Sequence, residues 1–466
     1  MKALVDPGNV LAEGLAAIRT RFQVPESFPP EVLAAAERAT QRTPDAHVDR
    51  TDRAFITLDP ARSTDLDQAF AIEVRGGDLL LFYAIADVSW FVDDGDPLDV
   101  EAWKRGTTLY LPDGKAGLYP PALSEGAASL LPTGPRPAVV FIVRVAPDGA
   151  VKLDGVERAL IRSRIKLGYE TVRDADLPPE FAELARRIAA AEARRGAARV
   201  DPPEQEVAER PDGSLALDFR VRHPSEDRNA ALSLATNLAV ADALLAHRTG
   251  LFRVMPEPDA GAIARLRNTA HILGVAWPEA ETFAAFEPRL DPARPREAAL
   301  MLAIRRAGRG ASYAPWQPGE TPWHAAVAAS YAHATAPLRR LADRYVVRAA
   351  LAVANGQPVP AVVEDAFARL PKVMARADAL SGQIDRAVID LAEAAMLQGR
   401  EGEVFAAGVT DIDARGARIQ LADYPVVARI AADGVAPGDT LRVRLTQADP
   451  GRFAVEFEPI ATGAPA

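Results

Sequence analysis

Three aspartates in one short segment are the residues best suited to chemistry. Asp59 follows a short apolar run, and Asp65 and Asp67 stand two positions apart, so that in an extended segment both side chains project to the same side. Close carboxylates repel each other unless a cation neutralises them, and hard oxygen ligands suit Mg²⁺ or Mn²⁺. Such an ion can clamp the oxygens of a phosphodiester during cleavage. The alternative is that these aspartates only form turns and caps.

A second candidate segment lies much later in the chain and is rich in arginine. Thr335 is a suitable N-cap, and Pro337 fits the first turn of the helix predicted to follow it. A helix N-terminus attracts a phosphate through its free N–H groups and dipole, and Arg339 and Arg340 would add to that attraction. The alternative pairs Arg339 with Asp343 on a solvated helix face and gives Arg340 no defined role.

Two tyrosines could serve either the core or a ligand. Tyr110 and Tyr169 could each pack in the interior or stack on a nucleic-acid base, since an aromatic face binds any base. His333 is expected to be a packed or hydrogen-bonded histidine. Other chemistries find no support, because the chain has no cysteine, no HExxH pair, no phosphate loop and no GxSxG elbow.

Composition predicts a soluble protein of two or three domains. The chain has 466 residues, of which 48% are hydrophobic and 25% charged. Its net charge of −10 argues mildly against nucleic-acid binding, although a local positive channel would be enough. The first residues do not form a signal peptide and no stretch approaches the apolar length needed to span a bilayer, so a cytoplasmic location is expected.

The elements that must position these side chains follow from periodicity and turn residues. Two helices are predicted between about residues 8 and 40, and a hairpin is predicted from strands 69–74 and 79–88. Five short strands after residue 401 suit a small barrel such as an OB-fold. Other predicted strands are 55–58, 107–111 and 139–145, and other predicted helices are 180–196, 230–249, 337–354 and 364–398.

Taken together, the segments resemble the RNB catalytic domain of RNase II-type exoribonucleases. The aspartate cluster matches the family's metal-binding signature, and four further motifs follow in family order at 83–89, 105–112, 118–131 and 336–340. The resemblance implies an α+β fold with a helical N-terminal element (1–50), a large mixed catalytic domain (51–400) and an OB-fold barrel (401–460). It resembles a short variant without the family's N-terminal cold-shock domains, which implies tolerance of partly paired RNA.

The resemblance also implies an activity and a set of site residues. The activity is hydrolytic 3′-to-5′ degradation of single-stranded RNA to nucleoside 5′-monophosphates with Mg²⁺, for which Mn²⁺ could substitute. RNA is the implied partner, with no membrane and no obligate protein partner. The implied metal ligands are Asp59, Asp65, Asp67 and Gln68; the catalytic residues are Asp67 and Arg339; the RNA-binding residues are Tyr110, Tyr169 and Arg340.

One departure from the family pattern leaves other functions open. The family's metal cluster usually ends in two adjacent aspartates, but here the second is Gln68, whose amide oxygen can ligate a cation without bringing charge. The C-terminal barrel also has few aromatic residues. One alternative is therefore an RNA-binding regulator with a weakened site, and another is a metal-dependent phosphoesterase for small nucleotides.

Overall fold

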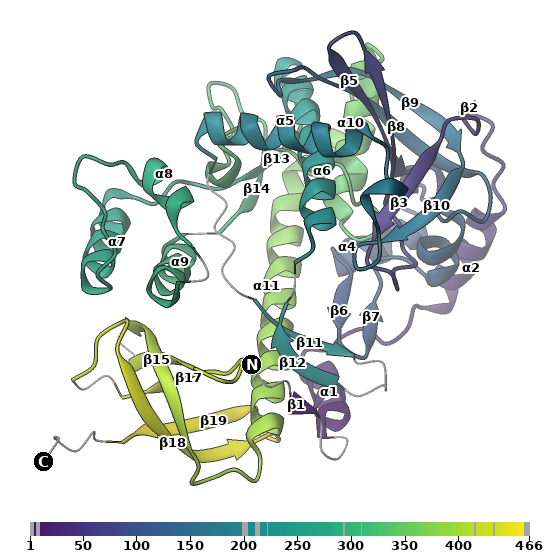
Figure 1. The fold of residues 1–466 in the computed structure, drawn as a ribbon. Coiled ribbons are helices and arrows are strands. Elements are labelled where there is room, and N and C mark those ends of the chain that lie inside the picture. Colours follow the sequence, from purple (N-terminus) through teal and green to yellow (C-terminus); the bar gives the residue numbers. More distant parts are fainter. Residues whose placement is uncertain are drawn as a thin grey trace, which may run out of the picture.

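The chain folds into a sheet covered by helices, a small helical lobe and a separate β-barrel, with the long helix α11 running between them (Figure 1). The mixed α+β architecture expected from the sequence is confirmed. The computed structural model describes residues 4–5, 10–197, 204–209, 215–220, 222–291, 294–308, 310–413, 416–431 and 434–460.

A seven-stranded sheet forms the largest layer. Its strand order is β10-β3-β4-β5-β8-β9-β2. The pairs β4–β5, β5–β8 and β8–β9 are antiparallel, and β10 runs parallel to β3. The strands are β2 (Val48–Asp49), β3 (Phe55–Asp59), β4 (Gln68–Arg75), β5 (Asp78–Ala86), β8 (Arg136–Val145), β9 (Val151–Ile161) and β10 (Ser163–Gly168).

Three helices pack against this sheet and build the first hydrophobic core. They are α5 (Glu180–Arg195), α6 (Pro224–Ala246) and α10 (Leu341–Ala354), and α6 contacts both other helices as well as β8 and β9. By length and composition alone α6 could cross a membrane, so the expectation that no stretch is long enough was wrong. However, 67% of its most apolar window is buried inside the protein, as in the central helix of a globular core.

The barrel and the N-terminal helix share a second core with α11 (Ala361–Leu397). That core joins side chains of α1 (Val10–Arg21), the last turns of α11 and the inner face of the barrel, which contacts α11 through β18 and β19. The barrel order is β17-β16-β15-β18-β19. Its strands are β15 (Val404–Asp413), β16 (Gly416–Leu421), β17 (Val427–Ile430), β18 (Thr440–Asp449) and β19 (Ala454–Pro459).

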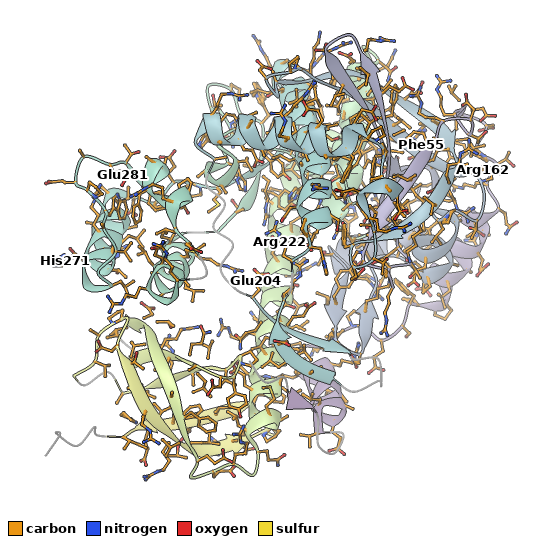
Figure 2. All side chains as sticks on the ribbon, viewed as in Figure 1. Phe55, Arg162, Glu204, Arg222, His271 and Glu281 are labelled. Carbon is orange, nitrogen blue, oxygen red and sulfur yellow. The ribbon has the colours of Figure 1, made fainter. Side chains whose placement is uncertain are left out.

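The remaining elements are short or lie at the edges of these layers. The helices α7 to α9 form a lobe with its own small core, and Figure 2 shows His271 and Glu281 on that lobe, well apart from the buried Phe55 of β3. These elements are β1 (Leu4–Val5), α2 (Pro30–Thr40), α3 (Val88–Phe91), α4 (Pro97–Arg105), β6 (Leu109–Leu111), β7 (Gly114–Ala116), η1 (Leu123–Ala127), η2 (Asp174–Asp176), β11 (Gln205–Glu209), β12 (Leu215–Phe219), β13 (Leu251–Val254), α7 (Ala260–Ile272), α8 (Phe283–Phe286), η3 (Glu287–Arg289), α9 (Pro295–Ala307), β14 (Ser312–Pro315) and η4 (Ala325–Val327).

Most predicted elements are present, with two kinds of difference. The two N-terminal helices, the β4–β5 hairpin and all five barrel strands are confirmed. Strands β9 and β10 were missed, because their polar and apolar residues alternate only in part and β10 pairs in parallel with β3 far along the chain. The helix predicted from Pro337 was wrong at its start, since α10 begins at Leu341.

Candidate active site

The acidic segment connects β3 to β4, with Asp59 at the end of one strand and Gln68 at the start of the other. Its backbone is held by a hydroxyl group from the 118–131 motif. The Leu66 N–H donates to Ser129 Oγ at 2.9 Å, and that hydroxyl donates in turn to the carbonyl oxygen of Thr64 at 2.7 Å. The 118–131 motif therefore fixes the loop that carries the aspartates.

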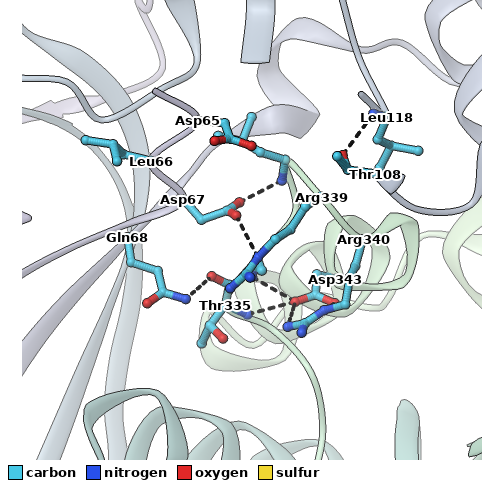
Figure 3. A network of polar contacts seen from close by, with 12 residues as sticks. Asp65, Leu66, Asp67, Gln68, Thr108, Leu118, Thr335, Arg339, Arg340 and Asp343 are labelled. Carbon is cyan, nitrogen blue, oxygen red and sulfur yellow. Dashed lines mark hydrogen bonds and ion pairs between the residues drawn. The ribbon is translucent and has the colours of Figure 1, made fainter. Parts of the chain in front are cut away.

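Asp67 is the most deeply placed of the three carboxylates and faces the arginine segment (Figure 3). Its Oδ1 accepts the backbone N–H of Leu338 at 2.7 Å, and its Oδ2 lies 3.3 Å from Nε of Arg339. Burial raises the pKa of Asp67 to about 7, while Arg339 and the Leu338 N–H favour the ionised form. The backbone carbonyl of Asp67 accepts from Ala86, in the 83–89 motif.

Arg339 lies in a turn that precedes α10, and the helix itself begins only at Leu341. The expected N-cap at Thr335 was wrong, because the carboxylate of Asp343 reaches back from the first turn of α10 and accepts the Thr335 N–H at 3.0 Å. Asp343 also binds Arg340 through two hydrogen bonds of 2.9 and 2.8 Å. The alternative pairing of Arg339 with Asp343 was also wrong, since Arg340 takes that place and leaves Arg339 to face the aspartates.

The β6–β7 hairpin holds the second carboxylate. Tyr110 is half-exposed, and its hydroxyl donates to Asp65 Oδ2 at 3.2 Å. Lys115 stands directly opposite Tyr110 in the hairpin and places its Nζ 3.0 Å from Asp65 Oδ1. The hairpin is joined to the arginine turn, because the Thr108 N–H donates to the carbonyl oxygen of Arg339 at 3.0 Å. Lys115 was missed from the sequence, although the turn residues between it and Tyr110 are a hairpin signal.

Asp59 is partly buried and carries an unsatisfied atom. Its Oδ2 is buried and has no hydrogen-bond partner. Burial raises the pKa of Asp59 to about 7, Asp65 raises it further and Arg339 opposes both. Tyr169 lies beside it: the Tyr169 N–H donates to the Asp59 carbonyl oxygen at 3.0 Å, and its hydroxyl accepts from Asn229 at 2.9 Å.

Gln68 has its amide group engaged by the protein at both ends. Its Nε2 donates to the carbonyl oxygen of Thr335 at 2.7 Å (Figure 3). Its Oε1 accepts from the Tyr83 hydroxyl at 2.5 Å and from the Ser233 hydroxyl at 3.3 Å. The structure therefore places Gln68 beside the site, with its polar atoms turned toward β5, α6 and the arginine turn.

The three carboxylates fit a hard divalent cation in their chemistry. An orphaned, buried carboxylate oxygen on Asp59 is the kind of atom that such an ion satisfies. Among the residues that the structure describes, no group of three or more His, Cys, Asp or Glu side chains is arranged to hold a metal. Asp65 and Asp67 each have a cationic neighbour, Lys115 at 3.0 Å and Arg339 at 3.3 Å.

Two surface cavities meet at the β6–β7 hairpin. One of about 640 Å³ lies between the acidic segment and the hairpin and is lined by Arg62, Asp65 and Lys115, among others. The other, of about 720 Å³, is bordered by β11, α9, α11 and the barrel, with Arg386 and Arg418 in its lining. Tyr110, Leu111 and Pro112 line both, so the two cavities adjoin at this hairpin.

Two protein-family models match the chain, one over the sheet and its helices and one over the C-terminal barrel. Residues 47–355 match the RNB domain family. Residues 403–460 match the RNase II-type exonuclease C-terminal S1 domain. The described site residues from Asp59 to Arg340 all lie within the first match.

Individual relatives share less than 30% sequence identity with the chain, but over most of its length. Ribonuclease R of Aquifex aeolicus is 27% identical over 495 residues, spanning 94% of this chain and 69% of that protein. Exoribonuclease 2 of Yersinia enterocolitica is 29% identical over 421 residues, spanning 83% of this chain and 63% of that protein. Mycoplasma genitalium RNase R, solved in complex with ribose-methylated single-stranded RNA, has a TM-score of 0.87 at 19% identity and covers 97% of this chain and 78% of its own.

Proposed function

The chain belongs to the RNB-domain family, and from this premise we propose that it is a hydrolytic exoribonuclease that shortens single-stranded RNA from its 3′ end in the cytoplasm. Its products are nucleoside 5′-monophosphates, and its cofactor is Mg²⁺, which Mn²⁺ can replace. The observation that carries the proposal is the meeting of Asp67 with the Leu338 N–H and the Arg339 guanidinium, beside the unsatisfied carboxylate of Asp59. A buried acid next to a half-exposed arginine suits a site that handles a phosphate.

Each residue has a role that its position supports. Asp59, Asp65 and Asp67 would hold the cation, which would neutralise charge on the phosphate oxygens. Arg339, whose side chain is 45% exposed, stabilises the charge that develops on the scissile phosphate. Tyr110 offers its ring to the 3′-terminal base. Tyr169, whose N–H donates to the Asp59 carbonyl oxygen, would make the ribose contacts.

Arg340 is a weaker candidate for RNA contact than Arg339. Both of its hydrogen-bonding nitrogens point at Asp343, and its side chain is only 25% exposed. A phosphate contact by Arg340 stays a prediction, and it would use the N–H donors that the pair with Asp343 leaves over.

A second candidate function is an RNA-binding regulator with a weakened site. Gln68 favours it, because a neutral amide stands where the family usually has an aspartate and its oxygen is occupied by two hydroxyl groups. This function predicts binding of RNA without shortening in any metal.

The test uses a 5′-labelled, single-stranded RNA with the full chain in Mg²⁺ and then in Mn²⁺. We expect a ladder or a short labelled end-product, and we expect the Asp67→Asn variant to bind the RNA without shortening it. Release of the label as a mononucleotide would show that the RNA is degraded from its 5′ end instead. If the RNA is bound but stays intact in both metals, the RNA-binding regulator replaces the exonuclease as the proposed function.

A further inference from the structure

Gln68 joins three separate elements at the edge of the site. Its side chain leaves the start of β4 and reaches the carbonyl oxygen of Thr335 in the arginine turn, Tyr83 on β5 and Ser233 on α6. Tyr83 is fully buried, and its hydroxyl lies 2.7 Å from that of Ser233. The two hydroxyl groups have two hydrogens for these three oxygens, so at least one of them donates to Gln68 Oε1.

The donor end of Gln68 does something that an aspartate could not do. A carbonyl oxygen only accepts hydrogen bonds, so the Thr335 oxygen needs the N–H of an amide, and a carboxylate there would repel it. Thr335 is buried, and its own N–H is bound by Asp343. The amide and Asp343 therefore pin the start of the arginine turn from two sides.

The acceptor end of Gln68 has little capacity left for a cation. An amide oxygen has two lone pairs, and here two hydroxyl groups, from Tyr83 and Ser233, address it. A metal ion at Oε1 would compete with these hydroxyl groups, the nearer of which lies 2.5 Å away. Among the described residues, a buried carboxylate oxygen without a hydrogen-bond partner is found instead on Asp59.

We propose that Gln68 is a positioning residue that clamps the 335–340 turn, so that the Leu338 N–H and Arg339 meet Asp67, and that it does not ligate the metal. The turn follows directly from Thr335, and the Leu338 N–H reaches Asp67 from within it. Figure 3 shows Arg339 approaching Asp67 from the same turn. Loss of the clamp disturbs the placement of Arg339 and leaves the three aspartates in place. The proposal rests on the proposed function only for its effect on turnover.

The experiment compares the full chain with Gln68→Met, which keeps the length of the side chain and removes both polar ends. Three quantities are measured: Mn²⁺ affinity without RNA by the electron paramagnetic resonance of free Mn²⁺, hydrogen exchange of the peptide covering 331–341, and kcat and KM on RNA. We expect unchanged Mn²⁺ affinity, exchange faster by roughly tenfold, and a kcat lower by roughly tenfold at constant KM, as for a lost buried hydrogen bond.

Two further variants keep the test decisive if Gln68→Met folds poorly. Gln68→Glu keeps the acceptor and loses the donor, so the clamp predicts lower kcat and faster exchange, whereas a ligand role predicts tighter Mn²⁺ binding. Tyr83→Phe frees one lone pair of Oε1, and a ligand role would again predict tighter binding, while the clamp predicts no change in Mn²⁺ affinity.

Weaker Mn²⁺ binding by Gln68→Met with unchanged exchange in the turn would overturn the proposal. If the unmodified chain shortens no RNA, the exoribonuclease proposal fails by itself. The Mn²⁺ and exchange measurements then still decide the role of Gln68, because neither depends on turnover.

Discussion

At the scale of single residues, Arg339 is the cation that the buried acids face, and it influences the pKa of Asp59, Asp67 and both site tyrosines. Arg339→Lys keeps the charge but loses the planar guanidinium that can hold a phosphate and Asp67 together. We expect kcat to fall by about 10²–10³-fold with little change in stability, as for loss of one preorganised donor on an exposed side chain. Single-turnover cleavage of labelled RNA measures this, with Arg38→Lys on the exposed face of α2 as the control.

Variants of Tyr110 can distinguish two roles of its side chain, one for the ring and one for the hydroxyl. The hydroxyl binds Asp65, and the half-exposed residue lines both cavities. If the ring stacks on a base, Tyr110→Ala weakens RNA binding by about 5–150-fold and Tyr110→Phe retains it. The dissociation constant is measured in the Asp67→Asn background, where the RNA stays intact. Equal losses in the two variants would assign the effect to the hydroxyl.

At the scale of elements, two hairpin glycines differ in what surrounds them. Gly76, between β4 and β5, and Gly149, between β8 and β9, both have positive φ, +64° and +77°. A Cβ at Gly76 would meet nothing within 4 Å, whereas at Gly149 it would collide with the backbone oxygen of Arg187 on α5. We expect Gly76→Ala to cost about 1–2 kcal/mol of backbone strain. Gly149→Ala should cost about 1–3 kcal/mol more from overpacking, visible as a lower unfolding midpoint.

Glu393 makes the junction of α11 with the barrel sensitive to pH. Its carboxylate accepts from Gln205 at 2.6 Å and from the Val427 N–H at 2.7 Å, and burial raises the pKa of Glu393 from 4.5 to about 8. The folded state therefore holds a proton that the unfolded chain releases, so this contribution to stability is complete below pH 4.5 and is lost as the pH rises to about 8.

Glu393→Gln keeps an acceptor oxygen at this position and cannot ionise. We expect its unfolding midpoint to exceed that of the unmodified chain by more at pH 8.5 than at pH 5.5. Thermal unfolding at the two pH values measures the difference, with Glu401→Gln, an exposed change nearby, as the control. A difference that does not vary with pH would show that Glu393 is ionised in the fold throughout.

Local elements were predictable where neighbouring residues determine the structure. The Gly-Gly turn before Asp78 predicts the β4–β5 hairpin, and the apolar runs on either side of it predict the strands. The start of α10 was not predictable from capping rules. Those rules favour Thr335 as the N-cap, but the Thr335 N–H is bound instead by the carboxylate of Asp343 from within the helix. The acidic cluster and Arg339 followed from motif order, but Lys115 and Asn229 contact the site only through tertiary folding.

At the scale of the whole molecule, one hydrophobic core crosses the expected boundaries after residues 50 and 400. Those boundaries stay predictions. Leu15 of α1, Leu391 of α11 and Phe405 of the barrel belong to the same buried cluster. Deletion of 401–466 would expose this apolar surface, each fully buried side chain being worth about 1.5–3 kcal/mol. We therefore expect the truncated chain to unfold at a lower temperature and to aggregate, as followed by light scattering during heating. Retention of the original midpoint with only weaker RNA binding would make the barrel an independent module.

The contact between Asp67 and Leu338 spans 271 positions of the chain. A ribosome therefore finishes the acids long before it finishes the arginine turn, and for most of synthesis the growing protein carries only half of its site. Cleavage of RNA is accordingly a signal that the catalytic part has been completed and folded, and it can serve as a direct readout of folding yield.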